Sequence, residues 1–313
     1  MKKYFLGIDG GASKTTALLA DRDGNILGRG VAGACNLQSM PENAARRALL
    51  EAVEAAFSAA SLPRQPVSAI GLGLAGGDRP GDRARVMAWV QEERLAHKAV
   101  IGNDGSLLLW AGTPAGWGIG VISGTGSIVF GRSQTGETAR AGGWGHRFGD
   151  EGSGYAIGTA ALRAIARAAD GRGPHTLLSE LILAHWGLQQ PGELIPHVYQ
   201  QNLPYAQVAA LTPLVSQAAE QGDAPAAAIL QEAGAQLAEA VAAVQRRLGL
   251  QGEIPAALGG GVLLNCARVR EALLCAAAQM GILLQPVALV SEPALGALKM
   301  ARENLSQSAG WIE

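Results

Sequence analysis

A glycine-rich turn near the N-terminus carries residue types that bind phosphate groups. Asp9 ends an apolar run and is followed by Gly10, Gly11, Ser13 and Lys14. Backbone N–H groups in such a turn can approach phosphate oxygens, because no large side chain intervenes. The Asp9 carboxylate can hold Mg²⁺ through water, since Mg²⁺ keeps much of its hydration shell. The turn lacks the Gly directly before Lys that a Walker A loop needs, and taken alone it fits a plain β-hairpin equally well.

A second turn of this kind lies at residues 123–127, with the sequence Ser-Gly-Thr-Gly-Ser between two apolar runs. Its alternating hydroxyl groups and glycines suit a second phosphate site lined by Gly124, Thr125 and Gly126. No helix is predicted directly after it, and the spacing fails the G-x-G-x-x-G pattern, so a dinucleotide-binding fold is disfavoured. An ordinary hairpin is the alternative. Two such turns at matching places in the two halves of the chain favour phosphate binding.

Two further segments follow predicted strands and precede predicted helices. Asp104 comes directly after the apolar run 99–102, at the strand end where ligand sites of α/β proteins form. The alternative role for Asp104 is an N-cap of the following helix. Gly260 and Gly261 follow the apolar run 256–258, and glycines at that place let a flat base lie against the backbone. The alternative there is an ordinary first turn of a helix.

The segment 142–154 is the densest in both glycine and polar groups. Six glycines surround an indole, an imidazole, a guanidinium and two carboxylates. Ordering such a loop costs much chain entropy, which favours a binding role. Trp144 and Asp150 suit a sugar, because they offer an apolar ring face and an acceptor for a pair of hydroxyl groups. We interpret His146 as a positioning residue and not a metal ligand, since no second His lies near it.

The elements that must position these residues alternate between strands and helices. Three apolar runs at 4–8, 15–20 and 26–31 predict a β-meander, and similar short runs begin again at 118. Strands are also predicted at 67–74, 99–102, 118–122, 127–131, 137–142, 256–258 and 282–285. Helices are predicted at 41–61, 81–94, 155–169, 176–185, 205–221, 224–248, 268–280 and 292–304. The pattern predicts a mixed α/β fold with a duplicated unit and a hinge around Pro114.

Composition excludes several classes of protein. A length of 313 residues suggests about two domains, and 48% hydrophobic with 16% charged residues argues against a disordered chain. The net charge of −1, from 25 basic and 26 acidic residues, gives no electrostatic reason to expect nucleic acid or an acidic membrane surface as a partner. No signal peptide or long uncharged apolar stretch is visible, so we expect a cytoplasmic protein.

The chain has three cysteines, Cys35, Cys266 and Cys275, which are too few for a disulfide framework. Cys266 and Cys275 are predicted to face opposite sides of a helix, so a shared metal is disfavoured. We interpret all three as buried free thiols.

Five segments, in this order, resemble the N-acetylglucosamine kinase branch of the BadF/BadG/BcrA/BcrD ATPase family, within the actin, hexokinase and heat-shock ATPase superfamily. They are Gly-Ile-Asp-Gly-Gly at 7–11, Asn-Asp-Gly at 103–105, Ser-Gly-Thr-Gly-Ser at 123–127, Gly-Gly-Trp-Gly-His-Arg-Phe-Gly-Asp-Glu-Gly-Ser at 142–153 and Gly-Gly-Gly-Val at 259–262. The segment at 142–153 is the most specific. The first turn departs slightly, since Ala12 and Ser13 stand where the family often has Gly-Thr.

The resemblance implies two ribonuclease-H-like domains around a cleft. The first would comprise residues 1–114 with a returning helix in 292–313, and the second residues 115–291. It implies transfer of the ATP γ-phosphoryl group to the 6-hydroxyl of an amino sugar. We expect closure of the two domains over the sugar to suppress hydrolysis of ATP by water.

The resemblance also assigns expected roles to residues. Asp104 would be the general base, and Asp9 would serve Mg²⁺. The nucleotide would be held by Gly10, Gly11, Ser13, Lys14, Gly124, Thr125, Gly126, Gly260, Gly261 and Asn265. The sugar would be held by Asn36, Asp104, Gly143, Trp144, Gly145 and Asp150.

Two other functions remain open at this point. The ATPases that activate benzoyl-CoA reductase or hydroxyacyl-CoA dehydratase carry an iron–sulfur cluster held by cysteines, and no Cys lies between residues 36 and 265 here. A non-catalytic sugar sensor or actin-like module would not need a base, so Asp104 and Asp150 together favour catalysis. Among sugars, N-acetylglucosamine is the first choice and glucosamine the second, followed by N-acetylmuramate or another hexosamine. Dimers are common among such enzymes, so a homodimer is also expected.

Overall fold

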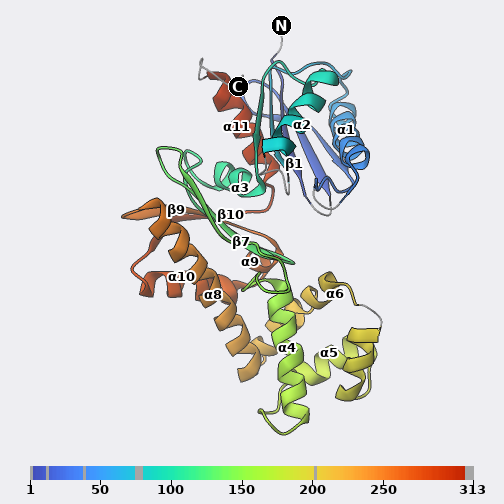
Figure 1. Cartoon of the computed structure of the whole chain (residues 1–313), viewed down its shortest axis with the longest axis vertical. Coiled ribbons are helices and arrows are strands. Elements are labelled where there is room, and N and C mark those ends of the chain that lie inside the picture. The colour runs from blue at the N-terminus through green and yellow to red at the C-terminus, as the bar shows by residue number, and fades with distance from the viewer. Residues whose placement is uncertain (1–2, 12–13, 38–39, 75–79, 201–202, 307–313) are drawn as a thin grey trace. The chain divides into compact units, whose positions relative to one another are not determined.

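The computed structural model describes the chain apart from residues 1–2, 12–13, 38–39, 75–79, 201–202 and 307–313 (Figure 1). The chain forms two compact units. Unit 1 comprises Met1–Trp117 with Glu292–Glu313, and unit 2 comprises Gly118–Ser291. The division after Trp117 lies slightly beyond the expected hinge at Pro114. Gly116 packs closely against the Trp110 ring of the same unit, since a Cβ at Gly116 would be 2.6 Å from ring atoms.

Unit 1 is built on a five-stranded sheet in the order β3-β2-β1-β4-β5. The strands are β1 (Phe5–Gly10), β2 (Thr15–Ala20), β3 (Ile26–Ala32), β4 (Ala69–Leu74) and β5 (Ala99–Gly102). The first three pair antiparallel, as a meander, whereas β4 and β5 run parallel to β1. Since parallel strands end at the same edge, the C-terminal ends of β1, β4 and β5 lie together there.

Helices cover both faces of this sheet. They are α1 (Glu42–Ala59), α2 (Pro80–Glu92), α3 (Asp104–Gly112) and α11 (Ala294–Ser306). Leu6 and Ile8 of β1 share a core with buried residues of α1 and α2, whereas the alternate residue Phe5 packs with α11. A Cβ at Gly7 would lie 2.5 Å from the backbone nitrogen of Leu298, so glycine is what allows α11 to lie directly on the sheet.

Unit 2 repeats this strand arrangement, in the order β10-β9-β6-β7-β8. The strands are β6 (Gly118–Ser123), β7 (Ser127–Arg132), β8 (Thr138–Gly142), β9 (Glu253–Gly259) and β10 (Leu283–Val290). Again three strands form an antiparallel meander, and two more join in parallel. The two sheets therefore confirm the predicted α/β class and its duplicated unit.

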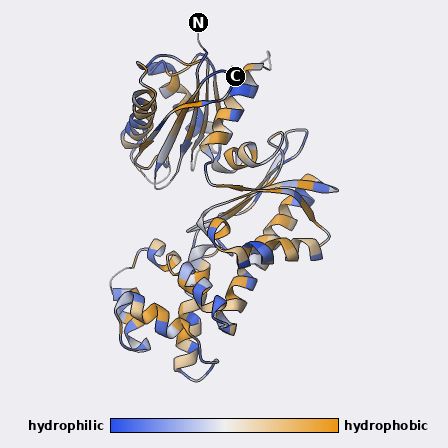
Figure 2. Ribbon diagram, turned by 180° about the vertical axis from the view of Figure 1, so that it is seen from behind, coloured by the Kyte–Doolittle hydropathy of each residue, from blue (hydrophilic) through white to orange (hydrophobic). Residues whose placement is uncertain are grey.

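The helices of unit 2 are α4 (Gly154–Ala169), α5 (Leu178–Trp186), η1 (Pro191–Glu193), η2 (Pro196–Gln200), α6 (Tyr205–Ala209), α7 (Thr212–Glu220), α8 (Ala224–Leu248), α9 (Gly261–Asn265) and α10 (Ala267–Gln279). Asp223 caps α8 by accepting a hydrogen bond from the backbone N–H of Ala226, and Gly249 ends the helix in a left-handed conformation. The helices carry hydrophobic and hydrophilic residues side by side (Figure 2), as expected where one face packs against a sheet or another helix.

Three predicted elements differ from the observed ones. The helix predicted at 205–221 is two helices, α6 and α7, and Pro213 stands in the first turn of α7, where its missing N–H is tolerated. The strand predicted at 282–285 continues to Val290 through a register shift around Pro286, which an edge strand can accommodate. In the predicted strand 67–74, only Ala69–Leu74 joins the sheet.

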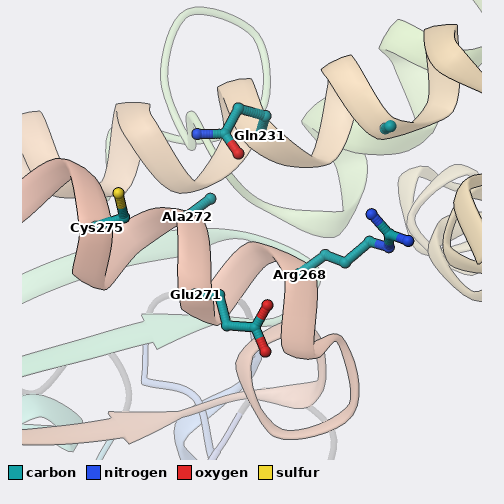
Figure 3. A pocket seen from close by; sticks show the side chains of 6 residues that line it. Gln231, Arg268, Glu271, Ala272 and Cys275 are labelled. Carbon is teal, nitrogen blue, oxygen red and sulfur yellow. The ribbon is translucent and has the colours of Figure 1, made fainter.

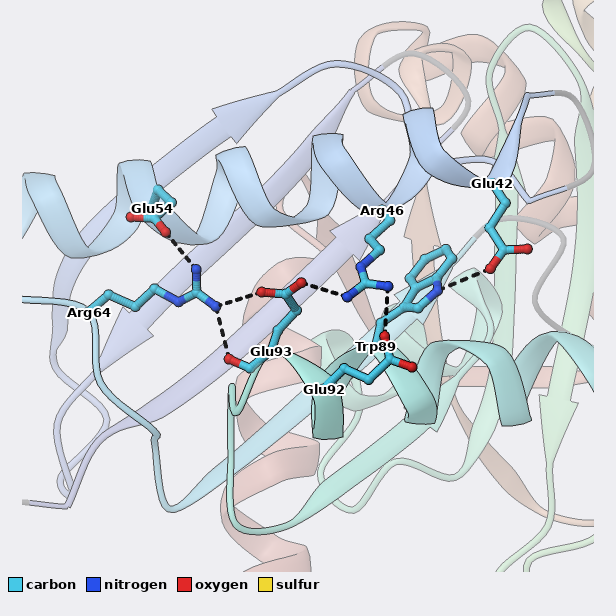
Figure 4. A network of polar contacts seen from close by, with 7 residues as sticks. All are labelled: Glu42, Arg46, Glu54, Arg64, Trp89, Glu92 and Glu93. Atoms are coloured by element: carbon cyan, nitrogen blue, oxygen red, sulfur yellow. Dashed lines mark hydrogen bonds and ion pairs between the residues drawn. The ribbon is translucent and has the colours of Figure 1, made fainter.

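A network of charged side chains ties α1 to the end of α2 (Figure 4). Glu93 accepts hydrogen bonds from Arg46 at 2.6 Å and from Arg64 at 3.2 Å. Arg46 also forms an ion pair with Glu92, and Arg64 forms one with Glu54, each at 2.7 Å. Hydrogen bonds from Arg46 and then Arg64 are the main reasons that the pKa of Glu93 is lowered.

We predict that Glu93→Gln lowers the melting temperature at neutral pH. A lowered pKa in the folded state means that the Glu93 carboxylate adds stability above its ordinary pKa of 4.5 and loses that contribution as the pH falls through its folded-state pKa. The difference between wild type and Glu93→Gln should therefore shrink below that pH in thermal denaturation. Glu51→Gln, which removes an exposed pair with Arg47, is the control and should change little. A constant difference from pH 7 to pH 3 would contradict the assignment.

Candidate functional site

The Asp9 and Asp104 positions lie at the same edge of the unit 1 sheet. Asp9 on β1 is opposite Gly73 on β4, and Gly73 is opposite Gly102 at the end of β5. Neighbouring strands are about 4.8 Å apart, so the backbones of Asp9 and Gly102 are about 10 Å apart. Asp104 begins α3 two residues after Gly102, which places both acidic residues at this edge.

Asn103, and not Asp104, caps helix α3. The Asn103 Oδ1 accepts hydrogen bonds from the Ser106 backbone N–H at 2.7 Å and from the Ser106 hydroxyl at 2.8 Å. Asp104 is therefore not required as the N-cap, the alternative role that the sequence left open for it.

The turn after β1 is held against the segment that carries Asn36. The Gly11 carbonyl accepts a hydrogen bond from the Cys35 N–H at 3.0 Å, and the Gly11 N–H donates to the Lys14 carbonyl at 2.9 Å. Asn36 directly follows Cys35, so it lies beside the turn of Gly10 and Gly11. Ser13 falls outside the described residues.

In unit 2, the 123–127 turn is hydrogen-bonded to the end of the 142–154 segment. The Ser123 hydroxyl donates to the Gly152 carbonyl at 2.8 Å, and the Ser127 hydroxyl donates to the Glu151 carbonyl at 2.7 Å. The Gly154 N–H donates to the Gly124 carbonyl at 2.8 Å. The outer two hydroxyls of Ser-Gly-Thr-Gly-Ser are thus used to fix the turn, whereas Gly124, Thr125 and Gly126 form its tip.

Asp150 is the buried carboxylate of this arrangement. It is 8% exposed and has a left-handed backbone, with φ of 59°. Its Oδ1 accepts a hydrogen bond from the Gly145 N–H at 3.3 Å, and its Oδ2 lies so near Gly126 that a Cβ there would be 2.7 Å away. Burial raises the pKa of Asp150, and the Gly145 and Ser127 N–H groups offset part of that rise.

Trp144 stands out from the same loop with its ring open to solvent. Its side chain is 64% exposed, and the Arg140 guanidinium lies 6.0 Å from the ring centroid. The flanking Gly143 and Gly145 both have positive φ, which only glycine adopts without strain. The Gly143 N–H donates to the Ser127 carbonyl at 3.0 Å, so the indole projects from a loop anchored at its base.

Gly260, Gly261 and Asn265 lie next to the 123–127 turn. A Cβ at Gly260 would be 2.3 Å from the Ser123 carbonyl oxygen, and one at Gly124 would be 3.7 Å from the Gly261 nitrogen. The Asn265 Nδ2 donates to the Gly261 carbonyl at 2.9 Å, across the short helix α9. The structure therefore brings together three segments of unit 2 that are far apart in the sequence.

We predict that Gly260→Ala lowers both stability and the affinity for ATP. With φ of 87° and ψ of 152°, Gly260 lies in a backbone region that is essentially restricted to glycine, so an L-residue costs about 1–3 kcal/mol there, and the new Cβ would also displace Ser123. Gly281→Ala is the matched control, because Gly281 has φ of 77° and nothing within 4 Å of a Cβ. Both variants should unfold at lower denaturant, but only Gly260→Ala should raise the KM for ATP. An unchanged KM in Gly260→Ala would remove Gly260 from the nucleotide site.

The predicted site residues thus form two groups. Within unit 1 they are Asp9, Gly10, Gly11, Lys14, Asn36 and Asp104, and within unit 2 they are Gly124, Thr125, Gly126, Gly143, Trp144, Gly145, Asp150, Gly260, Gly261 and Asn265. Sequence reasoning missed the hydroxyl groups of Ser123 and Ser127 as anchors. It also missed the aromatic neighbours of His146. The two serines are visible in the sequence, but the backbone carbonyl groups that their hydroxyls bind lie 29 and 24 residues further along the chain.

One prediction about the cysteines is wrong. Cys35 and Cys266 are buried, but Cys275 is exposed and lines a surface pocket of about 200 Å³ between α8 and α10 (Figure 3). Cys275 lies on α10, nine residues after Cys266, which is the N-cap residue of that helix. Among the described residues, no group of three or more His, Cys, Asp or Glu could hold a metal ion.

Curated relatives match most of the chain. It is 36% identical over 264 residues to the N-acetylmuramic acid/N-acetylglucosamine kinase of Clostridium acetobutylicum, a match that covers 84% of this chain and 86% of the relative. It is 34% identical over 264 residues to the N-acetyl-D-glucosamine kinase of Dictyostelium discoideum, which covers 80% of this chain and 82% of the relative.

Solved structures agree with the observed fold. A proposed N-acetylglucosamine kinase from Chromobacterium violaceum is 32% identical, with a TM-score of 0.73 over 95% of this chain and 98% of that one. A ROK family glucokinase from Streptomyces griseus is 18% identical, with a TM-score of 0.58 over 97% of this chain and 100% of that one, and shares the fold alone. These matches confirm the expected two-domain α/β fold of the superfamily. The model of the BadF/BadG/BcrA/BcrD ATPase family matches residues 6–301, and the chain therefore belongs to this family, as its motifs predicted.

Proposed function

We propose that this chain is an ATP-dependent kinase that transfers the γ-phosphoryl group to the 6-hydroxyl of N-acetylglucosamine. The observation that carries the proposal lies in unit 2. There, a loop with an exposed indole and a buried carboxylate is hydrogen-bonded to a glycine turn suited to phosphate. Membership of an ATPase family, with relatives named N-acetylglucosamine kinase, supports the nucleotide and the sugar.

Six residues are proposed to hold the sugar. The exposed Trp144 ring offers an apolar face to the pyranose, and the Asp150 carboxylate accepts hydrogen bonds from sugar hydroxyls. Backbone groups of Gly143 and Gly145 border the same space. Asn36 and Asp104 contribute from unit 1.

The nucleotide is proposed to contact the glycine turns of both units. Phosphate oxygens would lie against the turn that holds Gly10, Gly11, Ser13 and Lys14. They would also lie against the turn that holds Gly124, Thr125 and Gly126, where the Thr125 hydroxyl donates. The N–H groups of Gly11 and Gly124 are already used within their own turns. The nucleoside lies against Gly260, Gly261 and Asn265.

Mg²⁺ fits the donor set at the end of β1. Asp9 is a half-buried carboxylate there, and Mg²⁺ in such enzymes is held by one or two carboxylates together with water and phosphate oxygens. Binding of Mg²⁺ therefore does not require three protein ligands. When bound, the ion neutralises charge on the phosphate oxygens.

Asp104 is proposed to accept the proton of the sugar 6-hydroxyl. The hydroxyl oxygen then forms a bond to the γ-phosphorus while the bond from that phosphorus to the β,γ-bridging oxygen breaks, which releases ADP. Because the transition state is loose, orientation of the two reactants and neutralisation of charge provide most of the catalysis.

N-acetylmuramate is a second candidate substrate, since the relative from Clostridium acetobutylicum is named for both sugars. The Arg140 guanidinium beside Trp144 offers a cation for its lactyl carboxylate. Glucosamine is less favoured, because its ammonium group would call for a further carboxylate.

A cytoplasmic location and a homodimer remain predictions. None of the helices in the described part of the chain combines the length and apolarity that crossing a membrane requires.

Product analysis tests the proposal. The enzyme is incubated with MgATP and N-acetylglucosamine, and phosphorus NMR with proton coupling identifies the phosphorylated oxygen. We expect a 6-phosphate, and we expect 6-deoxy-N-acetylglucosamine to give no product. Phosphate on another oxygen, or turnover of the 6-deoxy sugar, would contradict the proposed reaction.

A further inference from the structure

The short helix α6 contacts the loop that carries Trp144. The Tyr205 ring at its first residue stacks on the His146 imidazole, with centroids 4.9 Å apart and planes inclined by 5°. His146 also meets the ring of Tyr155 from α4 edge-on, with centroids 5.0 Å apart and planes at 70°. The imidazole, which lies in the chain between Trp144 and Asp150, is therefore held between aromatic rings from two helices.

The other end of α6 is packed against the start of α4. A Cβ at Gly158 would lie 2.1 Å from the Val208 carbonyl oxygen, and one at Gly154 would lie 3.2 Å from the Ala209 Cβ. α6 lies beside α4 (Figure 1), and two glycines of α4 make this approach possible. Gly154 is also the residue whose N–H binds the Gly124 carbonyl of the 123–127 turn. One short helix thus contacts the Trp144 loop at one end and the support of the 123–127 turn at the other.

The outer part of the Trp144 loop is open to solvent, although the Gly145 N–H donates to the Asp150 carboxylate. Trp144 and Phe148 are 64% and 76% exposed, and nothing lies within 4 Å of a Cβ placed at Gly145. Glycine-rich backbone gains much conformational entropy when it is released. The His146 stack therefore restrains where the indole lies relative to Asp150, together with the bond from the Gly145 N–H.

We propose that Tyr205 is a positioning residue for the sugar, and this rests on the proposed kinase function. By stacking on His146, it holds residues 143–149 at a fixed place relative to the 123–127 turn. Its loss leaves the nucleotide-binding turns intact but lets the indole and the Gly145 N–H move away from the positions that bind the sugar. Tyr205 acts through His146 and does not touch the reacting atoms.

Steady-state kinetics separate this role from a general loss of structure. Tyr205→Leu keeps an apolar side chain but removes the ring face. It should raise the KM for the sugar by about 2- to 12-fold, which is the fold-change that corresponds to the interaction free energy of an aromatic pair. The KM for ATP should stay unchanged. Tyr205→Phe keeps the ring and should behave as wild type. The control Tyr199→Leu alters a tyrosine that is 77% exposed on η2 and should have no effect. Equal rises in both KM values, or a Phe variant as poor as Leu, would overturn the proposal.

A double-mutant cycle tests whether the effect passes through His146. Tyr205→Leu in a His146→Ala background should add nothing to the KM for the sugar, because the stack is already absent. Full additivity of the two substitutions would show that Tyr205 acts elsewhere, and would overturn the proposal.

Hydrogen exchange gives a readout that does not depend on turnover. Backbone amides of residues 143–149 should exchange faster in Tyr205→Leu than in wild type or Tyr205→Phe, while amides of β6 and β7 stay unchanged. Unchanged exchange at 143–149 would overturn the positioning role, whatever the activity. Failure of the wild type to phosphorylate any amino sugar would instead contradict the proposed function, and exchange would still decide the role of Tyr205.

Discussion

Asp104→Asn should lower kcat at least about 100-fold while the KM for the sugar stays close to that of wild type. A general base contributes about 10²- to 10⁴-fold to proton transfer from a hydroxyl group, and Asn cannot accept that proton. Asn has nearly the same size as Asp, and the cap of α3 is made by Asn103 and Ser106, so the helix should start as before. The loss should therefore fall on turnover and not on binding.

The control for this variant is Asp23→Asn, which neutralises an exposed acidic residue elsewhere in unit 1. Its steady-state constants should match those of wild type. Binding of the sugar to Asp104→Asn can be measured separately by isothermal titration calorimetry. Near-normal turnover in Asp104→Asn would remove Asp104 from the role of base.

Asp150→Asn should raise the KM for the sugar by about 10- to 100-fold without lowering the melting temperature at neutral pH. Loss of the charged acceptor weakens each hydrogen bond from a sugar hydroxyl, and hydrogen bonds to charged groups are worth about 1.5–3 kcal/mol. The charge is nonetheless unfavourable for folding, because burial of Asp150 raises its pKa despite the N–H groups of Gly145 and Ser127. Function, and not stability, would then account for a carboxylate at this place.

The sign of the pH effect follows from the raised pKa. Between its ordinary value of 3.8 and its raised folded-state value, Asp150 binds its proton more tightly in the folded protein. Its contribution to stability therefore falls as the pH rises through that window, and it costs stability above the window. Glu239→Gln, which neutralises an exposed carboxylate on α8, is the control and should keep both the KM and the melting temperature. A clear fall in the melting temperature of Asp150→Asn at pH 7 would contradict this description.

Local sequence patterns predicted the elements around the site well. Alternating apolar runs and glycine turns predicted both β-meanders, because a strand–turn–strand unit is specified by neighbouring residues. The positions of Asp9 and Asp104 at strand ends followed from the same patterns. Resemblance to a family implied that a helix within 292–304 returns to the first domain, and α11 packs on β1 and β4 of unit 1.

Contacts between distant segments could not be predicted in the same way. The bond from Ser123 to Gly152 joins residues 29 apart, and neither residue shows a periodic pattern that points to the other. The stack of His146 on Tyr205 joins residues 59 apart in the sequence, and the apolar pattern of 205–221 gives no sign of it. The exposure of Cys275 likewise depends on which face of α10 meets α8, a tertiary property that composition does not report.

The most direct test of the central claim is a coupled ADP-release assay with MgATP. N-acetylglucosamine, glucosamine, N-acetylmuramate and glucose are compared side by side at equal concentrations. We predict strong sugar-dependent ADP release with N-acetylglucosamine and much weaker release with glucosamine and glucose. The same low background of ATP hydrolysis with every sugar would contradict the assignment as an amino-sugar kinase, and the sugar-binding roles of Trp144 and Asp150 would have to be withdrawn.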